Sequence, residues 1–145
     1  MKKVAISGYF DPIHVGHLEF IELSKQLGDY LIVIVNNNAQ CKLKKGRHFM
    51  DEKDRMIIIS SIRWVDEVFL SVDQDKSVCK SLEIIKPNIF ANGGDRLNKE
   101  IPEASTCEEH NISLIDGIGK KIRSSSELTG FKPISSLPYN FIKYY

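Results

Sequence analysis

The sequence is poor in the cysteines that disulfide frameworks and zinc sites need. Three of its 145 residues are cysteines, Cys41, Cys79 and Cys107, and no two of them form a CxxC pair. An odd number of widely spaced cysteines argues against the disulfide framework of a small secreted domain, and this spacing does not suggest zinc. We expect reduced, structural thiols in a cytoplasmic protein.

Long apolar runs are also missing. Residues 31–35 and 56–59 form the longest ones, whereas a membrane-spanning helix needs about 20 apolar residues. The apolar run near Met1 ends at Ser7, so it is too short for the core of a signal peptide. We therefore expect no membrane partner and no export.

Neither sign of charge is in large excess. The chain has 20 Lys and Arg against 19 Asp and Glu, a net charge of +1 with neutral histidines. Nucleic-acid-binding domains usually carry a basic surplus or stripe, so we expect no nucleic-acid partner. The 42% hydrophobic and 27% charged residues are typical of a globular domain, and the length suffices for a core.

Short apolar runs alternate with stretches of helical periodicity. The predicted strands are residues 3–7, 30–35, 65–70, 88–92 and 112–115, and the predicted helices cover 18–23, 51–62, 76–86 and 102–110. Strands separated by helices favour a parallel sheet that is covered on both faces. The predicted fold class is α/β, a Rossmann-like doubly wound five-stranded parallel sheet. Its ligand crevice should lie at the strands' carboxyl ends, at the loops after strands one, four and five.

The stretch after the first predicted strand carries the strongest functional signal. It reads Ser7-Gly8-Tyr9-Phe10-Asp11-Pro12-Ile13-His14-Val15-Gly16-His17. A glycine at a strand-to-helix turn permits close approach to a phosphate, and the helix start presents unpaired N–H groups. His14 and His17 can project toward the same end, where two donors stabilise charge on a phosphoryl oxygen.

Two other interpretations of these histidines have to be considered. A single histidine at a helix start is more often a cap or a surface residue, but two at this spacing after a glycine favour function. Zinc-binding pairs on a helix favour i,i+4 spacing, and His48 and His110 lie in unrelated segments. We expect no metal held by protein side chains.

The stretch resembles the GxFDxxHxGH signature of the cytidylyltransferase-like nucleotidyltransferases. This group contains glycerol-3-phosphate cytidylyltransferase, pantetheine-phosphate adenylyltransferase and the heptose-phosphate adenylyltransferases, and residues 26–31 and 62–68 are similar to segments of the first. The resemblance implies the HxGH nucleotidyltransferase fold, in which His14 and His17 stabilise the pentavalent α-phosphorus. It also implies nucleotide contacts at Gly8, Tyr9, Phe10, Asp11 and Gly16.

Residues 42–47 predict a mobile basic loop after strand two. Solvated surface charge is the ordinary role of such a run. The resemblance implies that Lys44 reaches the phosphates of both substrates and is catalytic, and that Arg55 contacts the acceptor. The family's second lysine falls on Gly46, and a neighbouring basic residue could serve instead.

Two later stretches complete the expected nucleotide site. Residues 91–96 resemble the Gly-Gly-Asp of heptose-phosphate adenylyltransferases, which implies nucleotide contacts at Asn92, Gly93 and Asp95. Residues 120–128 resemble the RTxGISTT element of the family, which implies triphosphate contacts at Ser124, Ser125 and Ser126. Helix capping alone would also explain three serines at a helix start, and both can hold.

Together these features predict an enzyme. The resemblance implies that a nucleoside monophosphate from CTP or ATP is joined to a phosphorylated small molecule, a sugar or polyol phosphate, with release of pyrophosphate. It further implies Mg²⁺ on the triphosphate and a homodimer. An FMN or other mononucleotide adenylyltransferase, or a noncatalytic nucleotide sensor, is the alternative. We place the domain at 1–130 and interpret 131–145 as a tail that packs on it or on a dimer partner.

Overall fold

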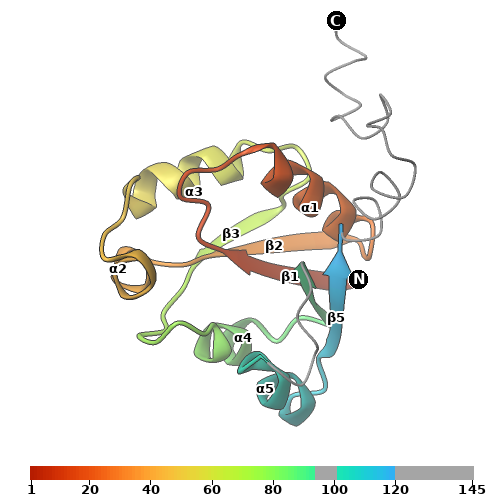
Figure 1. Cartoon of the computed structure of the whole chain (residues 1–145). Helices are drawn as coiled ribbons and strands as arrows, with labels where there is room; N and C mark the ends of the chain where they lie inside the picture. The colour runs from red at the N-terminus through yellow and green to blue at the C-terminus, as the bar shows by residue number, and fades with distance from the viewer. Residues whose placement is uncertain (94–100, 120–145) are drawn as a thin grey trace, which may run out of the picture.

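A computed structural model of the chain describes residues 1–93 and 101–119, and these form a parallel sheet between two layers of helices (Figure 1). The strands are β1 (Lys3–Gly8), β2 (Tyr30–Val35), β3 (Glu67–Leu70), β4 (Ile89–Gly93) and β5 (Ser113–Ile118). They are ordered β3-β2-β1-β4-β5, and all neighbours are parallel. The predicted Rossmann-like, doubly wound, five-stranded parallel sheet is confirmed.

The helices divide between the two faces of the sheet. They are α1 (Val15–Lys25), α2 (Asn38–Lys45), α3 (Glu52–Ser60), α4 (Cys79–Ile85) and α5 (Glu103–Glu109). In Figure 1, α1 and α3 lie over one face, and α4 and α5 lie over the other. The chain changes direction along the sheet between β1 and β4, which is where doubly wound folds bind ligands. None of the described helices has the length and apolar character that crossing a bilayer requires.

The central strands are buried on both faces, which explains their continuous apolar sequences. In β1, Val4 and Ile6 belong to a core with Ile21 of α1, while Ala5 points into a second core with Leu82 of α4. All five side chains are completely buried. The two cores hold the carboxyl ends of the strands in fixed register, and the candidate site is built on this edge.

The predicted basic loop at residues 42–47 is wrong for most of its length, because α2 continues to Lys45. Asn37 begins this helix with a reciprocal cap. Its Oδ1 accepts from the Gln40 backbone N–H at 2.9 Å, and Gln40 Oε1 accepts from the Asn37 N–H at 3.0 Å. Gly46 then ends the helix in the left-handed conformation, with φ of 86°.

The helix predicted at 76–86 begins later, at Cys79. The preceding residues form a side-chain-closed turn, in which Asp75 Oδ1 accepts from both the backbone N–H and the hydroxyl of Ser77 at 2.9 and 2.7 Å. An Asp side chain that satisfies a backbone N–H locally favours a turn over a helix. Lys76 therefore lies on a turn.

Candidate active site

The two histidines of the motif lie in contact at the start of α1. His14 caps the helix, and its Nδ1 accepts from the backbone N–H of Gly16 at 3.1 Å. The Nδ1 of His17 accepts from the backbone N–H of His14 at 3.0 Å. The rings stack, with centroids 3.8 Å apart and planes inclined by 28°. The structure thus brings together the two imidazoles that the spacing predicts to converge.

These backbone contacts fix which nitrogen of each neutral ring carries the proton. Since both Nδ1 atoms accept hydrogen bonds, we assign the proton of each ring to Nε2, which leaves both Nε2–H groups as donors. Burial, together with the neighbouring charges of His14 and Lys45, lowers the pKa of His17 to about 4, and burial has the largest effect. His17 is therefore neutral near pH 7 and acts there as a hydrogen-bond donor rather than as a charged acid.

The ring of Phe10 packs against the ring of His17. Phe10 is 2% exposed, and its ring meets the His17 ring edge-on, with centroids 5.0 Å apart. A Cβ on Gly8 would lie 2.8 Å from Cζ of Phe10, so this position needs glycine for the ring to fit. Both residues are expected nucleotide contacts. In the structure, the Phe10 side chain is part of the core and Gly8 makes room for it.

The carboxylate of Asp11 is turned inward. It accepts from the backbone N–H groups of Phe49 and Met50 at 2.8 and 2.6 Å. The ammonium of Lys45 lies 3.8 Å from Oδ2. Burial raises the pKa of Asp11, but these N–H donors and the charges of Lys45 and Arg55 outweigh it and hold the pKa below its usual value. Asp11 thereby fastens the link between α2 and α3 to the loop after β1.

Arg55 is also buried, at 1% exposure, although we expect it to contact the acceptor. Its guanidinium donates to the backbone carbonyls of Met50, Tyr9 and Asn36 at 2.9, 2.8 and 2.6 Å. A fourth bond reaches Asn38 Oδ1 at 2.9 Å. The side chain ties three loops together behind the site and does not face it.

A cavity of about 630 Å³ opens where β1, β2 and β4 end. Its lining residues are Ser7, Gly8, Tyr9, Asn36, Lys44, Lys76, Val78, Phe90, Asn92, Pro102 and Glu103. The ammonium of Lys44 lies 4.3 Å from the centroid of the Tyr9 ring. Asn92 Nδ2 is buried without a hydrogen-bond partner among the described residues, so a donor is left for a ligand. The structure thus groups Tyr9, Lys44 and Asn92.

Several of the described residues that we expect to contact the nucleotide do not line this cavity. His14, Gly16 and His17 are not among the residues that line the cavity. They lie on the α1 side of the same strand edge. Gly93 ends β4 and passes β5 closely, because a Cβ there would lie 3.4 Å from the Ile118 carbonyl. The remaining predictions lie outside the described residues: Asp95, Ser124, Ser125, Ser126 and the tail 131–145.

Sequence reasoning missed four polar residues of the cavity, Ser7, Asn36, Lys76 and Glu103. The rule that ligands bind at strand ends covers the loops after β2 and β3 as well, so it could have indicated Asn36 and Lys76. Glu103 has no such signal. It reaches the cavity because its Oε2 accepts from the backbone N–H of Val78 at 2.9 Å, which joins the starts of α4 and α5.

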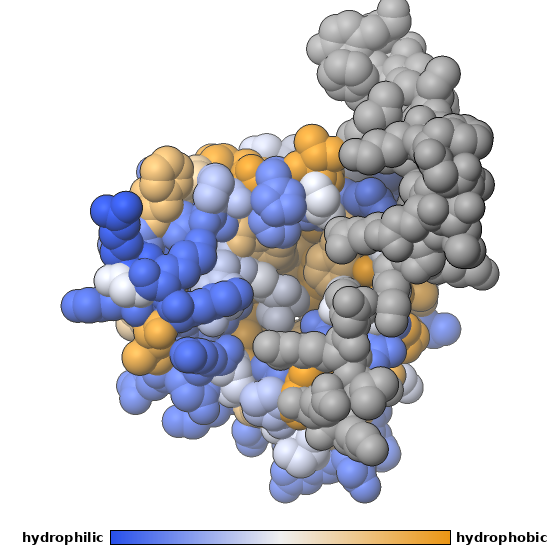
Figure 2. Space-filling view, viewed as in Figure 1, coloured by the Kyte–Doolittle hydropathy of each residue, from blue (hydrophilic) through white to orange (hydrophobic). Residues whose placement is uncertain are grey.

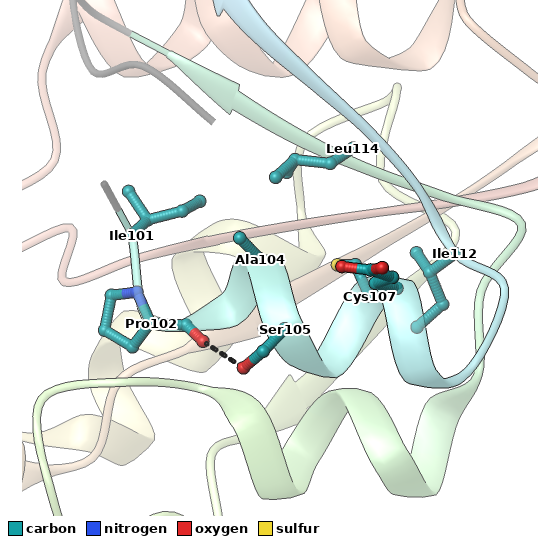
Figure 3. A pocket seen from close by; sticks show the side chains of 8 residues that line it. Ile101, Pro102, Ala104, Ser105, Cys107, Ile112 and Leu114 are labelled. Atoms are coloured by element: carbon teal, nitrogen blue, oxygen red, sulfur yellow. Dashed lines mark hydrogen bonds between the residues drawn. The ribbon is translucent and has the colours of Figure 1, made fainter. Parts of the chain in front are cut away.

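A second cavity, between α5 and β5, is different in character (Figure 3). It measures about 590 Å³, and Ile101, Ala104, Ile112 and Leu114 are among its lining residues. Burial, together with the charges of Glu103 and Cys79, raises the pKa of Cys107 in this cavity to about 11, and burial has the largest effect. A thiol with such a pKa is unreactive at neutral pH, so this cavity offers apolar surface rather than a catalytic group.

Hydrophilic side chains gather over α2 at the left of Figure 2. The helix contributes three lysines from its last turn, Lys42, Lys44 and Lys45. Among the described residues, no cluster of three or more His, Cys, Asp or Glu side chains could hold a metal ion. The three lysines make this end of α2 positively charged, which suits an anionic ligand.

Comparison with known proteins gives clear relatives. The chain is 42% identical over 96 residues to a FAD synthase of Ferroglobus placidus, covering 66% of this chain and 61% of that one. It is 39% identical over 110 residues to the bifunctional protein HldE of Helicobacter pylori, covering 74% of this chain and 23% of HldE. The chain thus spans less than two thirds of the length of either relative.

One solved structure is also similar to this chain in fold and in sequence. The lipopolysaccharide core biosynthesis protein of Thermoplasma volcanium has a TM-score of 0.68 and is 27% identical, covering 80% of this chain and 95% of that one. A family model described as Cytidylyltransferase-like matches residues 5–131, which include most of β1, the histidine motif and α2. The chain described here therefore belongs to the Cytidylyltransferase-like family.

Proposed function

We propose that the protein is a nucleotidyltransferase that transfers AMP from ATP to the phosphate of a small-molecule acceptor and releases pyrophosphate. The observation that carries this proposal is the stacked pair of His14 and His17, whose Nε2–H donors stand at a helix start. ATP is chosen over CTP because of the relatives. FAD synthase makes a product in which AMP is joined to FMN, and HldE corresponds to the heptose-phosphate adenylyltransferases that the Gly-Gly-Asp stretch resembles.

The chemistry needs positioning and charge stabilisation more than proton transfer. An oxygen of the acceptor phosphate forms a bond to the α-phosphorus, and the bond from that phosphorus to the β-phosphate oxygen breaks. The nucleophile is already ionised at neutral pH, so no strong general base is required. The Nε2–H groups of His14 and His17 stabilise the charge that gathers on the α-phosphoryl oxygens.

The placement of the groups supports an in-line reaction. The histidines belong to α1, on one side of the strand edge, while the cavity is closed by Val78 and Glu103 at the starts of α4 and α5. Attacking and leaving oxygens must lie on opposite sides of the phosphorus. We therefore assign the triphosphate to the α1 side and the acceptor to the cavity, with Lys44 between them.

The polarity of the cavity favours a sugar or polyol phosphate as acceptor. Ser7, Asn36, Asn92 and Glu103 offer donors and acceptors for hydroxyl groups, and Phe90 adds an apolar wall. FMN is the second candidate, and the 42% identity to a FAD synthase is the observation that favours it. Both acceptors present a phosphate monoester to the same cations.

Enzymes of this kind generally use a divalent metal ion with the nucleoside triphosphate. We propose Mg²⁺, held by the oxygens of the triphosphate, with Lys44 and the helix start of α1 completing the neutralisation of charge. Four further expectations stay predictions: the cytoplasmic location, the homodimer, the lack of a nucleic-acid partner, and the division into a 1–130 domain and a tail.

A pyrophosphate-release screen tests the proposal. ATP and CTP are each combined with glycerol 3-phosphate, heptose 1-phosphates, phosphocholine and FMN, and the products are identified by mass spectrometry. We expect release with ATP that depends on one acceptor and equals the adenylylated product in amount. Release with CTP alone would contradict the choice of donor. Nucleotide binding without release in any combination would indicate a sensor instead.

A further inference from the structure

Two lysines line the cavity, and they come from different elements. Lys44 belongs to the last turn of α2, and Lys76 belongs to the segment between β3 and α4. The family resemblance assigns a role to Lys44 and none to Lys76. Glu103 is the acidic residue of the same lining. Without Lys76, the charges of Lys44 and Glu103 would cancel, and the cavity would have no net positive charge to attract an anion.

The turn that carries Lys76 is held by the helix that carries Lys44. Gln40 is fully buried, and its Nε2 donates to the carbonyls of Asp75 and Ser77 at 2.7 and 2.8 Å. These carbonyls belong to the residues immediately before and after Lys76. Its Oε1 accepts from a backbone N–H in the cap of α2, which fixes the orientation of the amide. Gln40 and Lys44 are one helical turn apart, so α2 sets the positions of both lysines.

The rest of the segment is equally well fixed. Asn37 Nδ2 donates to the carbonyls of Ser71 and Asp73, both at 3.0 Å. The buried carboxylate of Asp73 accepts from the backbone N–H groups of Lys80 and Ser81 at 2.7 and 3.0 Å. The backbone at Lys76 is therefore already ordered in the folded protein, so ligand binding does not lose conformational entropy in this segment.

We propose that Lys76 is a specificity-determining residue that binds the acceptor's phosphate together with Lys44; this rests on the proposed function. A phosphate monoester carries a charge of about −1.5 to −2 at pH 7, which two ammonium groups match and one does not. The acceptor phosphate must also approach a triphosphate of the same sign. Lys76 acts on the bound acceptor before and during the reaction alike, so it governs acceptor affinity rather than the chemical step.

The test compares Lys76→Met and Lys76→Arg with wild type in steady-state kinetics. The acceptor is the compound that gives the fastest pyrophosphate release in the screen. We expect Lys76→Met to raise the KM for that acceptor about tenfold, with kcat and the KM for ATP nearly unchanged, and Lys76→Arg to recover most of the loss. Lys80→Met is the matched control: it removes the same charge from an exposed lysine of α4 outside the cavity lining, and it should leave all three constants unchanged.

A binding measurement gives a readout that does not depend on turnover. Inorganic phosphate is titrated into the protein with its donor site saturated by an ATP analogue that cannot react. Weaker phosphate binding in Lys76→Met than in Lys80→Met supports the assignment. An unchanged acceptor KM and phosphate affinity, or a raised KM for ATP instead, overturns it while the proposed function stands. If wild type releases no pyrophosphate, the proposed function fails, and the phosphate titration alone decides the role of Lys76.

Discussion

A methyl group on Gly16 would lie 2.9 Å from Cε1 of His14 and 3.1 Å from its Nδ1. The imidazole of His14 therefore occupies the space that a side chain at position 16 would take. The backbone N–H of Gly16 also donates to that same ring. The glycine between the two histidines of the motif has a direct physical reason, because it allows the first ring to cap the helix and stack on the second.

Gly16→Ala should displace His14 without unfolding the protein. Alanine is a better helix former than glycine by about 1 kcal/mol, and Gly16 is exposed in the first turn of α1. We expect kcat for pyrophosphate release to fall about tenfold or more through the lost donor, while the melting temperature is kept. Val15→Ala, which changes an exposed neighbour, should keep wild-type kcat. Normal turnover of Gly16→Ala would show that the position of His14 is not critical.

Replacing either histidine should slow the chemical step. His14→Ala and His17→Ala each remove one Nε2–H donor, and we expect kcat to fall by about 10² to 10³, the usual loss for one transition-state donor. Single-turnover measurements separate this effect from product release. His110→Ala is the control, because His110 follows α5 on the other face of the sheet. Wild-type single-turnover rates in either motif variant would refute the assigned role.

His17 should remain neutral over the range in which an ordinary histidine titrates. Its pKa is about 4 instead of 6.5. As the pH falls, the imidazole is therefore protonated at a higher pH in the unfolded chain than in the native protein. The contribution of His17 to stability is therefore complete above pH 6.5 and declines as the pH falls toward 4. Nitrogen-15 NMR of the imidazole should show an unprotonated Nδ1 and no titration between pH 8 and pH 5.5. A midpoint near 6.5 would contradict both the burial and the fixed tautomer.

Arg55→Met should destabilise the fold more than an exposed arginine does. The change leaves the carbonyls of Tyr9, Asn36 and Met50 without their donor, and each unsatisfied buried group costs about 1 to 3 kcal/mol. We expect the free energy of unfolding in urea to fall by about 3 kcal/mol or more in total. Arg63→Met, at an exposed arginine stacked on Trp64, should cost less than about 1 kcal/mol. Equal effects of the two changes would be inconsistent with the contacts of Arg55.

The sheet could be predicted because its sequence signals are local. Residues 30–35 form an unbroken apolar run that suits a strand buried on both faces, and the structure places β2 there. Helix α2 was missed because its lysines suggested a solvated loop. The sequence nevertheless contains signals for both ends of this helix, since Asn37 and Gln40 form a capping box and Gly46 adopts the left-handed conformation that ends it.

The candidate site was predictable where it depends on neighbours in sequence, and hidden where it depends on the tertiary fold. The spacing of His14 and His17 predicts that their rings converge, but the proton on Nε2 follows from backbone contacts that no pattern displays. Arg55 precedes buried Ile59 by one helical turn, which is a signal for an inward face that its charge obscured. Lys76 joins the site because β3 and β4 lie on opposite sides of β2 and β1 in the sheet, so the segment between β3 and α4 has to pass the ends of these two strands.

The hold of α2 on the Lys76 turn has a consequence for protein engineering. The contacts that place both lysines join residues 37–81, which is one uninterrupted stretch of chain. The contacts described between this stretch and the loop after β1 involve two residues of that loop, Asp11, through its carboxylate and carbonyl, and Tyr9, through its carbonyl and ring. Residues 37–81 could therefore be exchanged between relatives as one segment, together with Tyr9 and Asp11. We expect such a chimera to have the acceptor preference of the protein that donates the segment and the nucleotide preference of the protein that receives it.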